Sequence, residues 1–83
     1  MTHQKRDAQL CKYIIMHSNR IELALKQISS INDFKENQIL QNSILFDLLQ
    51  IGENINNLSE EFVAKAPDIE YRKIVNLRNL IVH

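Results

Sequence analysis

Apolar residues recur at steps of three and four along almost the whole chain, the spacing that gathers side chains on one face of an α-helix. In the segment 5–29 this stripe consists of Leu10, Ile14, His17, Ile21, Ala24 and Ile28. In the segment 34–58 it consists of Leu40, Ile44, Leu48, Ile51, Ile55 and Leu58. The pattern therefore predicts two long helices, and the single glycine and single proline of the chain leave little to interrupt them.

Polar residues that favour turns and helix caps separate these segments from each other and from a shorter C-terminal part. The run 29–33, Ser-Ser-Ile-Asn-Asp, predicts the end of the first helix. Ser59 can cap a short third helix, which Pro67 ends. Asp68 can cap a fourth helix that begins at Ile69 and runs to the end of the chain. We therefore expect an all-α fold, an antiparallel up-down bundle of four helices.

The length of the chain limits how large its own core can be. A chain of 83 residues makes one domain, so the whole of 1–83 is assigned to a single helical unit. A domain this short buries only about 60% of its unfolded surface, which leaves a marginal core. The second helical segment also carries a further apolar flank, formed by Leu45, Phe46 and Leu49. We therefore expect the chain to form a homodimer.

Charge, cysteine content and the lengths of apolar runs narrow the possible functions. Ten basic and ten acidic side chains cancel, so contact with nucleic acid would need a local patch. The longest uninterrupted apolar run, 13–16, is far too short to span a bilayer, and we expect a cytoplasmic protein without a membrane partner. Cys11 is the single cysteine, and no metal set or phosphate loop stands out, so we expect neither metal nor cofactor. His17 is expected to be a hydrogen-bonded histidine in the core or in a dimer interface.

The last eight residues hold the side chains with the clearest chemical potential. Arg78 and Asn79 lie side by side, and His83 follows four residues after Asn79. A guanidinium keeps its charge at any biological pH and binds phosphate in a bidentate geometry. An imidazole can transfer a proton near pH 7. This segment therefore supplies the pair of groups that metal-free cleavage of RNA needs.

Helix geometry leaves other interpretations open. Arg78 lies beside the apolar face of its helix, where Glu53 or Asp47 could pair with it in a structural ion pair. Arg78 and His83 are about 140° apart, so one straight helix cannot aim both at one phosphate. A terminal histidine can equally be a surface residue. Glu53 and the asparagines at 56 and 57 form a polar ridge, which is either a solvated face or a wall beside the Arg-His segment.

Several of these residues together resemble the pattern of a known family. In order, the chain contains Ile51-Gly52-Glu53, Leu58-Ser59, Pro67-Asp68-Ile69, Tyr71 and Arg78-Asn79-Leu80-Ile81-Val82-His83. This order resembles the HepT-like toxins of the HEPN superfamily, whose pattern reads Ile-Gly-Glu, Leu-Ser, Pro, an aromatic residue, and Arg-Asn with a His shortly after. The resemblance covers residues 44–83 by motif, and the first helix agrees in length and pattern.

The resemblance implies a fold, an activity and partners. It implies an all-α bundle that forms homodimers, with the Arg-His segments of two subunits lining a shared cleft. It also implies a metal-independent ribonuclease that acts as a toxin, paired with an MNT-type nucleotidyltransferase antitoxin. Carried over by position, Arg78 and His83 are the catalytic pair, and Asn79 and Glu53 are supporting residues. RNA is the implied substrate.

The chain departs from the family pattern at its end. The family continues past the motif histidine into a tyrosine, which the antitoxin adenylylates in some pairs, and a further helix. The given sequence stops at His83, so we expect a domain that lacks the C-terminal helix and the acceptor tyrosine, either as a fragment of a longer product or as a shortened member of the family. The alternative to a ribonuclease toxin is an inactive helical module for dimerisation or antitoxin binding.

Overall fold

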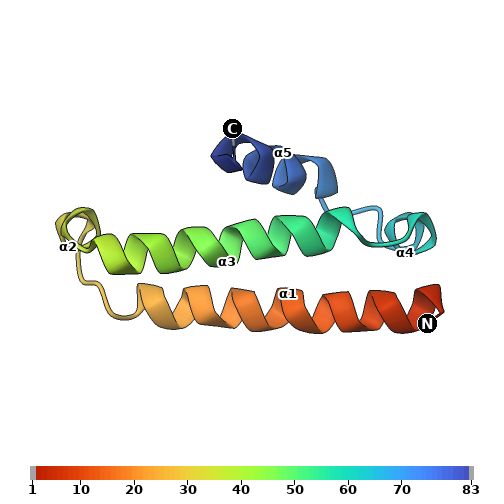
Figure 1. Cartoon of the computed structure of the whole chain (residues 1–83), viewed down its shortest axis with the longest axis horizontal. Coiled ribbons are helices and arrows are strands. Elements are labelled where there is room, and N and C mark those ends of the chain that lie inside the picture. The colour runs from red at the N-terminus through yellow and green to blue at the C-terminus, as the bar shows by residue number, and fades with distance from the viewer. Residues whose placement is uncertain (1, 83) are drawn as a thin grey trace.

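The protein is all-α, as the apolar periodicity predicts. A computed structural model describes the backbone of residues 2–82 and the side chains of all of these residues except 77, 78 and 80–82. Figure 1 shows the helices in chain order, which are α1 (His3–Leu25), α2 (Ile31–Glu36), α3 (Gln38–Asn56), α4 (Glu60–Lys65) and α5 (Tyr71–Val82). No helix in the described part of the chain combines the length and apolarity needed to cross a membrane.

The predicted second helix, 34–58, is wrong at its N-terminal end, because two capping side chains divide this region. Ser30 caps α2 by accepting a hydrogen bond from the backbone N–H of Asp33 at 3.2 Å. Asn37 then ends α2 and caps α3, with its Oδ1 accepting from the N–H of Leu40 at 2.9 Å. Each cap satisfies an N–H group that the first turn of a helix leaves without a partner, so the chain gains two helix starts where the periodicity suggests one.

The C-terminal part begins later than the sequence predicts. Ser59 does cap α4, accepting from the N–H of Phe62 at 3.1 Å. α4 ends at Lys65, shortly before Pro67, as expected. The prediction that Asp68 caps the last helix is wrong, because residues 67–69 form a turn and α5 starts only at Tyr71. This turn lets the chain reverse after α4 and carries α5 back along α3.

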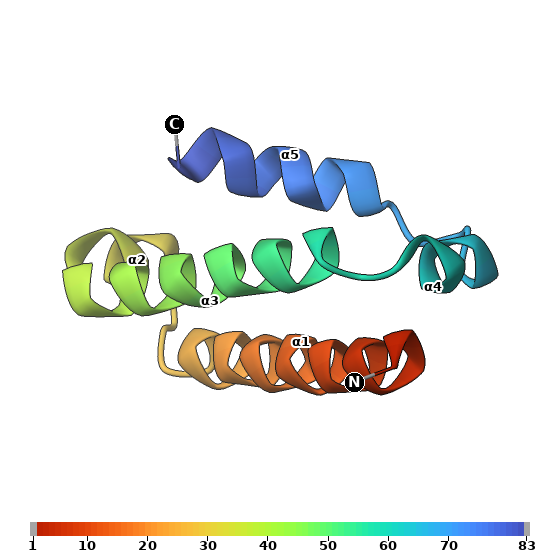
Figure 2. The ribbon, with the colours of Figure 1, turned by 45° about the vertical axis from the view of Figure 1, so that its right-hand side comes forward.

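The three longest helices lie in a row with α3 in the middle. α1 packs against one side of α3 and α5 against another, and consecutive members of the row run antiparallel (Figure 1). Turning the molecule by 45° keeps α3 between the other two helices (Figure 2). The four-helix bundle is therefore not confirmed, although the up-down course of the chain is. Gly52 is buried on α3.

The centre of the α1–α3 interface is polar. Asp47 on α3 is 0% exposed, and its Oδ1 forms a hydrogen bond with Nδ1 of His17 at 2.8 Å and an ion pair with Nε of Arg20 at 3.2 Å. His17 is thus the hydrogen-bonded core histidine that the sequence predicts, and its ring also meets the edge of Phe46. A buried carboxylate needs such donors, since an unpaired charge in a low-dielectric interior is costly. The second oxygen of Asp47 has no partner among the described residues.

A second polar contact ties the start of α1 to the start of α4. Asp7 is buried, and its carboxylate accepts hydrogen bonds from the N–H of Ser59 at 2.9 Å and from its hydroxyl at 2.6 Å. These two bonds favour the ionised carboxylate and lower the pKa of Asp7 below its ordinary value. Arg6 adds a bond to the backbone carbonyl of Asn57 at 2.6 Å. The start of α1 is therefore held to the segment that follows α3 by contacts between residues 51 and 52 positions apart in the sequence.

Candidate functional site

The backbone of α5 carries most of the segment on which the sequence concentrates its chemistry. Arg78 falls in the second half of this helix, and Asn79 follows it with a half-buried side chain. Glu53 is half-buried on α3, the helix against which α5 packs. The side chain of Arg78 and all of His83 lie outside the described residues, so their roles stay predictions. So does the alternative that Arg78 pairs with Glu53 or Asp47, although Asp47 already binds His17 and Arg20 of α1.

One edge of α5 borders a hollow with both polar and apolar walls, which we call the α3–α5 groove. It has a volume of about 280 Å³ and is lined by the end of α3, by α4 and by the first half of α5. Asn56 comes from α3, and Arg72 and Asn76 come from α5. Val63 and Val75 add apolar wall. None of the described residues that line this hollow is an aspartate or a glutamate. The groove therefore offers one cation and two amides without an opposing carboxylate.

The other edge of α5 borders an apolar hollow of about 370 Å³. Its walls come from four helices, with Ile15 on α1, Ile51 on α3, Phe62 on α4 and Ile74 on α5. Tyr71 lines it too, and the hydroxyl of this side chain is buried with no partner among the described residues. Burial raises the pKa of Tyr71 above its ordinary value, since the phenolate is poorly solvated there. α5 thus borders one hollow with mixed walls and one with mainly apolar walls, and Tyr71 lines both.

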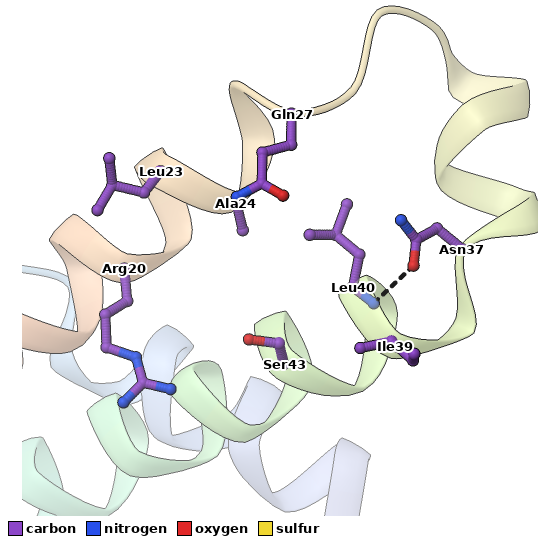
Figure 3. A pocket seen from close by; sticks show the side chains of 8 residues that line it. All are labelled: Arg20, Leu23, Ala24, Gln27, Asn37, Ile39, Leu40 and Ser43. Carbon is purple, nitrogen blue, oxygen red and sulfur yellow. Dashed lines mark hydrogen bonds between the residues drawn. The ribbon is translucent and has the colours of Figure 1, made fainter.

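A third hollow lies far from the start of α5, between the C-terminal end of α1 and the N-terminal end of α3 (Figure 3). Its volume is about 380 Å³, and Arg20, Gln27, Asn37 and Ser43 give it polar walls. Arg20 is half exposed here while its Nε binds the buried Asp47. The charge of this guanidinium is therefore largely balanced from within the fold, which makes the hollow less attractive to anions than the presence of an arginine suggests.

Sequence reasoning missed two features of these surfaces. It named Asp47 only as a possible partner of Arg78, yet Asp47 continues the stripe Leu40, Ile44, Asp47, Ile51 at steps of four, three and four. A polar residue on that stripe, together with His17 on the stripe of α1, signals a buried pair between the helices. It also passed over Arg72, whose relation to Asn76 and Asn79 is visible as spacing. No cluster of three possible metal ligands occurs among the residues whose side chains the structure describes.

Comparisons with known proteins find similarity over most of the chain. The family model described as "HepT-like: Ribonuclease HepT-like" matches residues 14–83. Two curated proteins of Methanocaldococcus jannaschii are similar over 79 residues, or 95% of this chain. "Putative RNase MJ1380" is 27% identical, with 72% of its own length covered. "Putative RNase MJ0127" is 24% identical, with 65% of its length covered. No solved structure matches the chain.

The family match spans the whole of α3 and of α5, and it includes the motif region at 78–83. It begins at Ile14, so it includes about half of α1. Both the ordering of motifs and the all-α architecture agree with this match. The chain therefore belongs to the HepT-like ribonuclease family.

Proposed function

We propose that the protein is a metal-independent ribonuclease whose reaction takes place beside the second half of α5. The observation that carries the proposal is that the family match runs through residue 83 and contains Arg78, Asn79 and His83 in the expected order. The two relatives named as RNases support the same class of substrate. The chain spans 72% of the length of one of these relatives and 65% of the other. The activity that their names state therefore comes to this chain as a proposal.

In the proposed reaction the RNA 2′-hydroxyl attacks the adjacent phosphorus. The 2′-oxygen forms a new bond to phosphorus while the bond to the 5′-oxygen breaks, which leaves a 2′,3′-cyclic phosphate and a 5′-hydroxyl end. His83 moves a proton between these oxygens, and Arg78 stabilises the negative charge that builds up on the phosphate. Asn79 orients the histidine or contacts the phosphate, and Glu53 supports the site from α3.

The proposal includes a homodimer with the reacting groups at its interface. Positions 78 and 83 are about 140° apart around a straight helix, so a second copy answers how both groups reach one phosphate. Exposed apolar side chains support association, because burial of such surface drives it. The apolar hollow between α1 and α5 provides a further unfilled surface beside the motif helix. Only Ala24, Leu40 and Ile55 are buried apolar residues in the described part of the chain, so a single copy has a small core.

We further propose that the protein is the toxin of a toxin–antitoxin pair in the cytoplasm. Its antitoxin would be a nucleotidyltransferase of the MNT type, as the family resemblance implies. The alternative function is a helical module that binds a partner without cleaving RNA. The apolar hollow of about 370 Å³ favours this second function, since its apolar lining suits the apolar side chains of a protein partner better than it suits RNA.

Cleavage of RNA by variants of the purified protein separates these functions. Arg78→Ala and His83→Ala should each reduce the rate by at least about a hundredfold, the low end for a general acid or base. Activity of the wild type should persist in EDTA, and the product should carry a 2′,3′-cyclic phosphate. Lys65→Ala is the control, because Lys65 lies on α4, where its ammonium pairs with Glu61 at 3.1 Å. Cleavage that survives His83→Ala, or that requires added magnesium, would favour the binding module.

A further inference from the structure

The α3–α5 groove combines chemical features that suit one unit of a nucleic-acid strand. Arg72 is exposed on the first turn of α5 and forms no ion pair with the described residues. Its neighbour Lys73 pairs instead with Glu70 at 3.0 Å and does not line the groove. A free guanidinium binds phosphate more readily than a cation already paired with a carboxylate. Arg72 is therefore the cation that can serve an anion in this groove.

The lining of the groove fits the rest of a nucleotide as well. Asn56 and Asn76 face it from two helices, and both side chains are exposed and hold amide donors and acceptors. Tyr71, Val63 and Val75 supply apolar wall, against which a base or sugar can pack. The absence of carboxylates from the lining removes the repulsion that a phosphate would otherwise meet.

Helix register connects this groove with the motif. Arg72, Asn76 and Asn79 follow one another at steps of four and three, so they lie on one face of α5. Along the helix axis, Arg72 and Asn79 are about 10 Å apart. In the sequence the same spacing reaches His83, which lies outside the described residues. A strand lying along this face would pass from Arg72 in the groove to Asn79 in the motif.

We propose that the α3–α5 groove binds the RNA strand next to the cleaved bond, with Arg72 holding a flanking phosphate and Asn76 contacting the adjacent sugar or base. This inference rests on the proposed ribonuclease function and extends it to residues that the motif does not include. Arg72 and Asn76 bind substrate and take no part in proton transfer. The groove is expected to accept single strands, because phosphate, sugar and base surfaces must all be reachable from one side.

The test compares Arg72→Ala with Lys73→Ala in the full chain. Each change removes one positive charge from neighbouring positions, and only the first removes it from the groove. With a 5′-labelled single-stranded oligouridylate as the probe, Arg72→Ala should weaken binding about tenfold or more, as expected for loss of a charged hydrogen bond. The slope of log affinity against log salt should fall by about 0.7, the value for one phosphate contact on a single strand. Arg72→Lys should restore the slope more fully than the affinity.

Kinetics give the second arm of the test. Arg72→Ala should raise KM for cleavage and leave kcat close to that of the wild type, because it removes binding common to the ground and transition states. If the wild type cleaves RNA and Arg72→Ala behaves like Lys73→Ala in both assays, the groove proposal is wrong while the ribonuclease function stands. If the wild type binds the probe without cleaving RNA, the ribonuclease function fails and the binding assay still decides for or against the groove. Absence of both binding and cleavage overturns both proposals.

Discussion

The α1–α3 pair and α5 use polar residues in different ways. In the pair, the buried His17 and Asp47 bind each other, and Asp47 also pairs with the half-exposed Arg20. On α5, Arg72 and Asn76 are exposed and line a groove. Buried polar groups fix which helices meet and in which register, whereas exposed ones are free to bind other molecules. The comparison assigns stability mainly to the first region and binding mainly to the second.

The largest expected effect is on the packing of α3. Ile55 is 8% exposed, so Ile55→Asp places a carboxylate among apolar side chains and should cost several kcal/mol, comparable to the stability of a small domain. Circular dichroism should show an unfolded or molten chain. Ile39→Asp is the matched control on the same helix, because Ile39 is 84% exposed and its change should leave the melting curve nearly unaltered. Equal effects of the two changes would show that the core is placed wrongly.

The next effect concerns the buried pair itself. Asp47→Ala leaves the ring of His17 without its acceptor and should destabilise the fold by roughly 3 kcal/mol, measured by urea unfolding. The double change His17→Leu with Asp47→Leu should recover much of this loss, since apolar residues can replace a buried polar pair. Arg20→Ala should cost less than about 1 kcal/mol, because Arg20 is half exposed and its interaction is screened by water. An Arg20→Ala effect as large as that of Asp47→Ala would contradict this ranking.

The sequence is informative about where helices occur, and much less informative about how they pair. Steps of three and four predict that helices occur along 5–29 and in the later segments, because the spacing of apolar side chains is a local property. The pairing of His17 with Asp47 depends on how two distant helices align, and no local pattern specifies that alignment. The break at Asn37 depends on its side chain, which accepts from the N–H of Leu40, and the spacing of apolar residues does not specify such a cap. For the candidate site, Arg78 and His83 come from the motif alone and stay predictions.

A smaller effect is expected at the contact between α1 and α4. Ser59→Ala removes the cap of α4, together with the hydroxyl that donates to Asp7. The loss should be about 1 kcal/mol, the usual value for an N-cap. Thermal unfolding should register it as a drop in Tm of a few degrees. Ser59→Asp would restore a capping acceptor but would set two carboxylates side by side, so it should not rescue the contact with Asp7.

The smallest effect is a dependence of stability on acid. The pKa of Asp7 is lowered in the folded state by hydrogen bonds from Ser59, so its ionised form stabilises the fold. This contribution is fully present above the ordinary pKa of 3.8 and is lost as the pH falls through the lower folded value. Asp7→Asn should therefore flatten the stability profile below about pH 4 relative to wild type. An unchanged profile would show that the carboxylate gains nothing from Ser59.

The position of α5 at the outside of the row has a kinetic consequence. α3 is covered by helices on two sides, while α5 packs mainly on α3 alone. A helix held by one neighbour can open without unfolding the rest, at a free-energy cost below that of global unfolding. Amide hydrogens in α5 should therefore exchange with solvent sooner than those in the middle of α3. Any molecule that binds only the docked form of α5 would slow that exchange by mass action, so protection of these amides would report occupancy of the helix.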